Sequence, residues 1–97
     1  MMTPRYRLRY NIRFQPLGDE YIGVAVGADA ARFTDMLRLN ETGAHIAQLL
    51  EEPRTINELA EILASEYDEQ LDLLHDIVKD TIASLSDIVE TTKETEE

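Results

Sequence analysis

The sequence predicts an α+β fold, in which a three-stranded antiparallel sheet is followed by a three-helix bundle of winged helix-turn-helix type. Three observations lead to this fold class. Residues 5–39 alternate as strands do, residues 41–89 follow the helical period, and 97 residues are enough for one small domain. We expect residues 1–89 to form that domain and residues 90–97 to be a disordered acidic tail.

The first predicted strand shows the strongest pattern, because residues 5–14 alternate between polar and apolar side chains without a break. A turn over residues 16–20 leads to a second strand at Tyr21–Val26, which is apolar and β-branched. A connection over residues 27–31 then leads to a third strand at Phe33–Leu39. Short connections between consecutive strands predict an antiparallel meander.

Capping residues mark the first two predicted helices. Asn40 can cap a helix that ends near Leu50, and Gly43 in its first turn is expected to let another segment approach closely. Thr55 and Glu58 have the spacing of a capping box and open the second helix.

The third predicted helix, residues 70–89, has an apolar sector of about 180°, wider than the usual one-sided stripe. Two readings of this width remain open. One side of the sector can line a groove beside an edge strand, where an extended peptide adds to the sheet. Alternatively, the other helices and the sheet cover the whole sector.

Charge is divided unevenly along the chain, whose net charge is −11. Residues 1–39 hold six arginines and four acidic residues, whereas residues 40–97 hold three basic and sixteen acidic residues. The acidic half disfavours nucleic acid and anionic membranes and suits a neutral or basic partner, although acidity also serves solubility alone. The chain has no cysteine, no membrane-spanning stretch and no signal-peptide pattern, so we expect a cytoplasmic protein.

No pattern in the sequence indicates an active site. The two histidines, His45 and His75, lie on different predicted helices, and the acidic clusters fall in a connector and in the tail. We therefore expect no catalytic residue, no metal ligand and no cofactor. A DNA-binding role is a weaker alternative, because the third helix has one lysine, Lys79, among several aspartates.

A longer pattern resembles a known family. The segment Leu39–Ala44 (LNETGA), followed by Arg54-Thr55, Glu58-Leu59 and Tyr67-Asp68, resembles the PqqD family. The resemblance implies a small non-catalytic chaperone that binds the leader segment of a ribosomally made precursor peptide. It also implies that the leader joins the third strand as an extra strand and that the partner enzyme, commonly a radical S-adenosylmethionine protein, carries the cofactors. A structural subunit of that enzyme is a further alternative.

Carried onto this chain, the resemblance gives a set of candidate peptide-binding residues. The docking strand supplies Phe33, Thr34, Asp35, Met36, Leu37, Arg38 and Leu39. The third helix supplies Leu71, Leu74, His75, Val78 and Ile82. Leu73 and Ile77 are then expected in the core, although the reverse assignment of the two helix edges is nearly as plausible. Arg38 is a candidate partner for a leader carboxylate.

Overall fold

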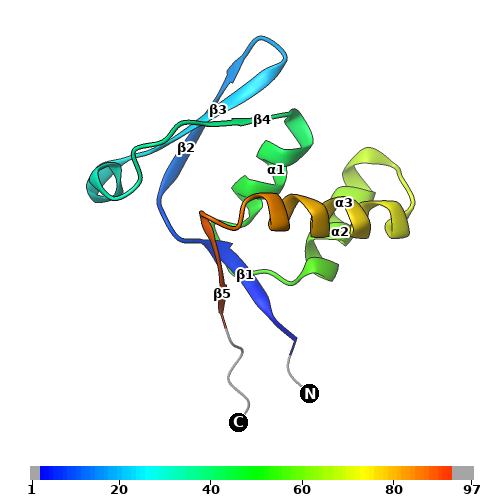
Figure 1. Ribbon diagram of the computed structural model, residues 1–97. Helices are drawn as coiled ribbons and strands as arrows, with labels where there is room; N and C mark the ends of the chain where they lie inside the picture. The colour runs from blue at the N-terminus through cyan, green and yellow to red at the C-terminus, as the bar shows by residue number, and fades with distance from the viewer. Residues whose placement is uncertain (1–2, 93–97) are drawn as a thin grey trace.

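The computed structural model describes residues 3–92, which form strands, three α-helices and one short 3-10 helix (Figure 1). The elements in chain order are β1 (Arg5–Leu8), β2 (Ile12–Leu17), β3 (Glu20–Ala25), η1 (Gly27–Ala31), β4 (Leu37–Leu39), α1 (Glu41–Leu49), α2 (Ile56–Tyr67), α3 (Leu71–Ser84) and β5 (Val89–Thr92).

The main sheet is the predicted antiparallel meander, with strand order β2-β3-β4. Its hairpin is tighter than the predicted turn, because Leu17 pairs with Glu20 across a two-residue loop. Gly18 opens this loop with φ of +64°, the position that a type II′ turn reserves for glycine. The sheet and the three helices after it confirm the predicted fold class.

The predicted long first strand is wrong in one respect: it is two strands, which belong to different sheets. β1 pairs with β5, and Arg9 donates its backbone N–H to Ile88 at 2.7 Å before the chain bends into β2. Residues 90–92, expected in a disordered tail, are therefore part of β5, and residues 93–97 lie outside the described residues. The alternation of side chains continues through the bend, so it could not reveal the change of partner.

The third strand and the third helix are shorter than predicted. β4 covers only Leu37–Leu39, and residues 33–36 do not pair with β3. The ring of Phe33 instead stacks on Tyr10, with 5.2 Å between ring centroids, and its N–H bonds to Asp29 at the end of η1. α3 ends at Ser84, and the buried residues Leu85 and Ile88 follow in a turn.

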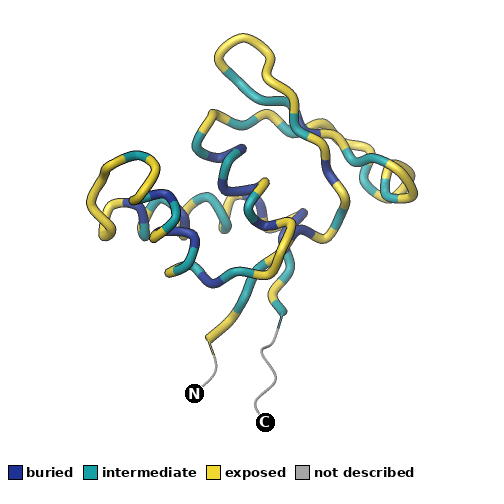
Figure 2. Tube along the Cα trace, turned by 180° about the vertical axis from the view of Figure 1, so that it is seen from behind, coloured by how far each residue is buried: buried dark blue, intermediate teal, exposed yellow. Residues whose placement is uncertain are grey.

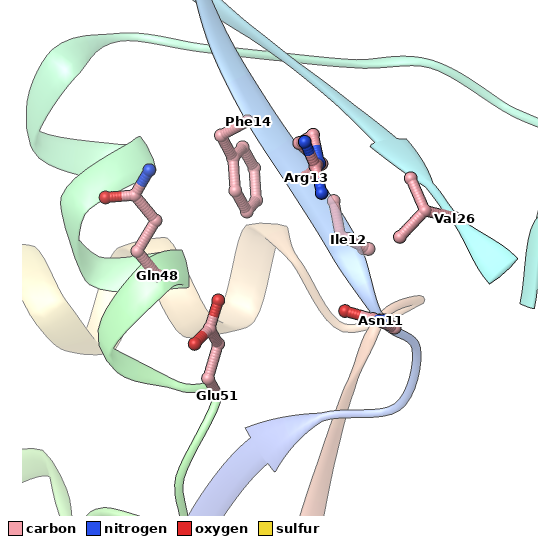
Figure 3. Close-up of a pocket in the computed structure, with 7 residues that line it drawn as sticks. All are labelled: Asn11, Ile12, Arg13, Phe14, Val26, Gln48 and Glu51. Carbon is pink, nitrogen blue, oxygen red and sulfur yellow. The ribbon is translucent and has the colours of Figure 1, made fainter.

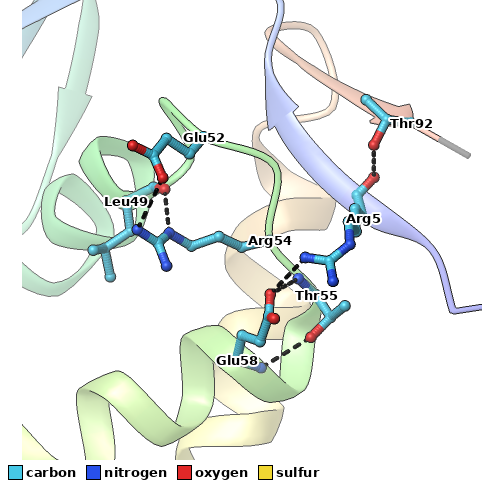
Figure 4. A network of polar contacts seen from close by, with 7 residues as sticks. All are labelled: Arg5, Leu49, Glu52, Arg54, Thr55, Glu58 and Thr92. Atoms are coloured by element: carbon cyan, nitrogen blue, oxygen red, sulfur yellow. Dashed lines mark hydrogen bonds and ion pairs between the residues drawn. The ribbon is translucent and has the colours of Figure 1, made fainter. Parts of the chain in front are cut away.

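The predicted helix caps are confirmed. Asn40 Oδ1 accepts the Gly43 N–H at 2.7 Å. Thr55 Oγ1 accepts the Glu58 N–H at 3.0 Å, and Glu58 accepts the Thr55 N–H at 2.9 Å (Figure 4). Arg5 of β1 binds the same carboxylate at 3.0 Å, which ties the second sheet to the start of α2.

The core lies between the helices and one face of the main sheet. Figure 1 shows the helices gathered to one side of this sheet, and Figure 2 shows burial concentrated in the helices, with the hairpin tip and η1 exposed. Its largest fully buried side chains are Ile46, Leu50, Leu59, Leu63, Val78 and Ile88. On the inner sheet face the ring of Phe14 lies over Gly23, where an added Cβ would come within 2.6 Å of the ring.

Candidate functional site

The backbone of β4 has one side that is bonded to β3 and one side that faces outward. Val26 donates its N–H to Asn11 at 2.9 Å, so these two residues form a hydrogen-bonded antiparallel pair. Hydrogen-bonded pairs recur at every second residue, so the even-numbered residues of β3 face β2 and the odd-numbered ones face β4. Leu37 and Leu39, which pair with Gly23 and Tyr21, are therefore bonded to β3. The N–H and C=O of Arg38 point to the open edge.

The other edge of the sheet is blocked in part by a proline. By the same alternation, β2 turns the backbone of Ile12, Phe14 and Pro16 away from β3. Pro16 has no N–H to offer an added strand, and proline on an edge strand is a common device against such pairing. The β4 edge has no proline, so it is the better place for strand addition. Pro16, which was assigned to the predicted turn over residues 16–20, is the sequence signal that distinguishes the two edges.

The side chains of β4 point alternately to the two faces of the sheet. Leu37 and Leu39 are half-buried against the core, whereas Arg38 is exposed on the outer face. Arg38 binds one oxygen of Glu20 with both Nε, at 3.1 Å, and Nη2, at 2.7 Å. A guest carboxylate at this place would have to share Arg38 with Glu20, a partner that sequence reasoning missed.

The remaining candidates on the docking segment lie outside the ladder. Phe33 is half-buried through its stack on Tyr10, and Thr34 and Asp35 are exposed. Met36 is 63% exposed and lies on the outer side of the sheet beside Ile22. The structure therefore brings Leu37, Arg38 and Leu39 together as a strand. Residues 33–36 precede this strand and do not pair with β3.

The candidates on α3 divide between the core and the surface. Leu74 and Val78 are buried, with 3% and 0% exposure, so they do not reach a guest in this conformation. Leu71 is 40% exposed, and His75 and Ile82 are half-buried along one flank of the helix. The expectation that Leu73 lies in the core is wrong, since it is 50% exposed. The buried face of α3 is formed by Leu74 and Val78, and Leu73 lies to one side of that face, although Leu74 in the same turn is buried.

The cap of α1 explains why glycine occupies position 43. The segment that approaches Gly43 is the end of β4, because a Cβ at this position would meet Asn40 Oδ1 at 3.0 Å and the Leu39 Cβ at 3.6 Å. Helix α1, which packs on β3 and β4, thus starts directly behind the candidate edge. Rigid capping at this joint fixes the position of the edge strand.

A cavity lies on the opposite side, beside the outer edge of β2. It has a volume of about 470 Å³, and Gln48 and Glu51 at the end of α1 face β2 across it (Figure 3). A neighbouring depression of about 350 Å³ shares Asn11, Ile12 and Glu51. Both are lined mainly by polar and charged groups and lack the apolar wall that a peptide anchor needs.

The titratable groups inside the described range do not form a site for chemistry. His45 lies 3.4 Å from the Tyr67 hydroxyl and 3.4 Å from a Glu66 oxygen. Burial, with the nearby carboxylate of Glu41, raises the pKa of the Tyr67 phenol. Residues 3–92 contain no group of three or more histidine, aspartate or glutamate side chains able to hold a metal ion. Within the same residues, none of the helices has the length and apolar character needed to span a bilayer.

Together these features define a small winged helix-turn-helix-like domain with an open edge at β4 and no assembled reaction centre among the described residues. Residues 19–91 match the family model described as coenzyme PQQ synthesis protein D (PqqD). This match covers well over half of the sequence, so the chain belongs to the PqqD family.

One solved structure supports the fold independently. The chain resembles the solution structure of the PqqD truncation of Methylobacterium extorquens PqqCD, described as a functional and stand-alone recognition element for ribosomally synthesised and post-translationally modified peptides. The TM-score is 0.67 at 17% identity, and the alignment covers 89% of this chain and 88% of that one. No curated protein matches the sequence.

Proposed function

We propose that this protein captures the leader segment of a ribosomally made precursor peptide and presents it to a modifying enzyme, of the radical S-adenosylmethionine type. Membership of the PqqD family and the likeness to a peptide recognition element support the general role. In this proposal the chain performs no chemistry itself and works in the cytoplasm, where ribosomes release the precursor.

The observation that carries the mechanism is the open edge of β4. An extended leader would bond to the outward N–H and C=O of Arg38 and continue along the unpaired residues 34–36. Each backbone hydrogen bond contributes about 0.5–1.5 kcal/mol net, and such bonds do not distinguish one peptide sequence from another. Specificity then depends on apolar guest side chains that lie on the inner face beside Leu37 and Leu39.

Helix α3 would supply the wall against which those anchors pack. Its exposed candidate is Leu71, with the half-buried His75 and Ile82 along the same flank. Leu74 and Val78 would support this wall from the core. A guest that covers Leu71 and one or two neighbours gains roughly 25 cal/mol for each Å² of apolar surface removed from water.

The test is an NMR titration of the labelled protein with synthetic peptides that span the short reading frames encoded beside its gene. Binding should shift the amide signals of Met36, Arg38 and the α3 flank and leave those of Ile12 and Phe14 in place. Arg38→Pro removes an outward donor, and Arg38→Ala is its matched control because both variants lose the guanidinium. We expect Arg38→Pro to bind about two- to tenfold more weakly than Arg38→Ala, the value of one hydrogen bond.

Other outcomes distinguish the alternatives. Shifts confined to Ile12 and Phe14 would move the docking site to the β2 edge. Salt-dependent retention of labelled DNA in a gel-shift series, without a peptide response, would favour a DNA-binding domain. Capture of the modifying enzyme that does not change when precursor is added would favour a purely structural subunit.

A further inference from the structure

The outer face of the main sheet is apolar at its centre and is not covered by the protein's own helices. Strand β3 carries Ile22 and Val24 on this face, and Leu17 of β2 and Met36 lie beside them. Leu17, Val24 and Met36 are 62%, 39% and 63% exposed. Sheets normally cover an apolar face with a second layer, and the three described helices all lie on the opposite side (Figure 1).

This face is also hollowed. A depression of about 250 Å³ is lined by Gln15, Pro16, Leu17, Ile22 and Met36. Four of these five side chains are apolar, so the depression suits a branched aliphatic side chain better than a polar group.

A second apolar patch lies elsewhere, on the first turns of α3. Of the five exposed large hydrophobic side chains in residues 3–92, the two outside the sheet face are Leu71 and Leu73. Helical spacing puts Asp76, Ile77 and Asp80 on the same face as Leu73, at i+3, i+4 and i+7. Asp76 and Asp80 are exposed and form no ion pair within residues 3–92.

The two patches differ in the charged side chains beside them. Arg13 and Arg38 point to the outer sheet face. Arg38 is bound to Glu20 on the same face, whereas Arg13 has no ion-pair partner among the described residues. Residues 1–39 carry six arginines against four acidic residues, whereas the helical half is strongly acidic. Within the described part of the chain, the sheet face thus offers an apolar hollow with one unpaired arginine on the same face, and the Leu73 face of α3 offers an apolar side chain beside two unpaired aspartates, so the two surfaces are complementary between copies.

We propose that a second copy of this chain docks the Leu73 face of α3 onto the outer face of the main sheet. Leu73 enters the hollow between Leu17 and Met36, and Asp76 and Asp80 approach Arg13 and share Arg38 with Glu20. The contact joins two different surfaces, so each copy keeps one free surface and association continues head to tail at high concentration. The patches are small, so the association belongs with weak, transient contacts. It does not depend on the proposed peptide-binding role.

The test is sedimentation equilibrium of the full-length protein from about 10 μM to about 1 mM, the range in which weak contacts form. We expect the weight-average mass of the wild type to rise with concentration and to fall as salt is added. Met36→Asp and Leu73→Asp should each remain monomeric, because each lacks one of the two surfaces. Both side chains are mostly exposed, so the variants should keep the wild-type circular dichroism spectrum.

The mixture of the two variants makes the test specific. Each variant retains the surface that the other has lost, so an equimolar mixture should form one-to-one dimers and nothing larger. Ser65→Asp, which adds the same charge at an exposed position on α2, is the matched control and should associate as the wild type does. A wild type that stays monomeric at every concentration overturns the proposal. A Leu73→Asp variant that associates as the wild type does would also overturn the proposal. That result would point to pairing between the sheet faces of two copies.

Discussion

A pair of proline substitutions tests the alternation of bonded and open positions along β4. Leu37 pairs with Gly23, so Leu37→Pro removes an N–H that bonds to β3 and leaves the Gly23 carbonyl without its partner. Arg38→Pro removes an N–H that points to solvent. Relative to the alanine variant at the same position, we expect Leu37→Pro to lower the free energy of unfolding by about 1–3 kcal/mol. The same comparison at Arg38 should give a loss well under about 1 kcal/mol.

The measurement is urea denaturation of the four variants, followed by circular dichroism. Comparison with alanine cancels the loss of each side chain, including the exposed ion pair between Arg38 and Glu20. A loss of about 1–3 kcal/mol is a large share of the stability of a small domain and is well resolved. Amide hydrogen exchange provides a second reading, with slow exchange at Leu37 and Leu39 and fast exchange at Arg38. Equal losses at the two positions, or the opposite order, would show that β4 has the other register and that Arg38 does not offer its backbone to a guest.

Three further predictions concern stability. Gly23→Ala puts a Cβ 2.6 Å from the Phe14 ring and should lower the free energy of unfolding, measured by urea denaturation, by about 1–3 kcal/mol. Val24→Ala on the outer face should lower it clearly less. A Gly23→Ala protein as stable as wild type would mean that the ring has free space to move. Thr55→Ala removes the side-chain cap of α2 and should lower the free energy of unfolding by about 1 kcal/mol. Asn57→Ala, at an exposed position of the same helix, should lower it by only a few tenths of a kcal/mol. Equal losses would count against the capping box. The raised pKa of Tyr67 means that the folded protein holds this phenolic proton more tightly than the unfolded chain does, so stability should be intact below pH of about 10 and should fall as the pH rises through the raised pKa. Tyr67→Phe should remove that part of the alkaline decline in thermal unfolding, and an unchanged decline would contradict the assignment.

The predictions made from the sequence were right where a feature depends on neighbouring residues. The cap by Asn40 and the box between Thr55 and Glu58 join groups three residues apart, so spacing alone predicted both. The meander followed from short connections between apolar strands. The starts of α1 and α2 followed from their caps.

The errors fall where a partner is distant in sequence. Alternation over residues 5–14 predicts an extended chain but not which strand lies beside it, so the bend between β1 and β2 was missed. Residues 90–92 are polar enough to be predicted as a tail, and Val89 was assigned to the third helix. Together they form β5 because β1, more than eighty residues earlier, offers its edge. For the same reason the apolar width of α3 could not be divided between core and surface until α2 and the sheet were in place.

The sequence by itself determined that this chain is one small acidic α+β domain with capped helices, because period, caps and charge are local properties. Only the tertiary structure decided which strand edge stays open, that Leu73 is exposed, and that an apolar sheet face lies uncovered opposite the helices. Those features depend on which strands pair and which faces pack, and such choices are made by residues that meet only when the chain has folded.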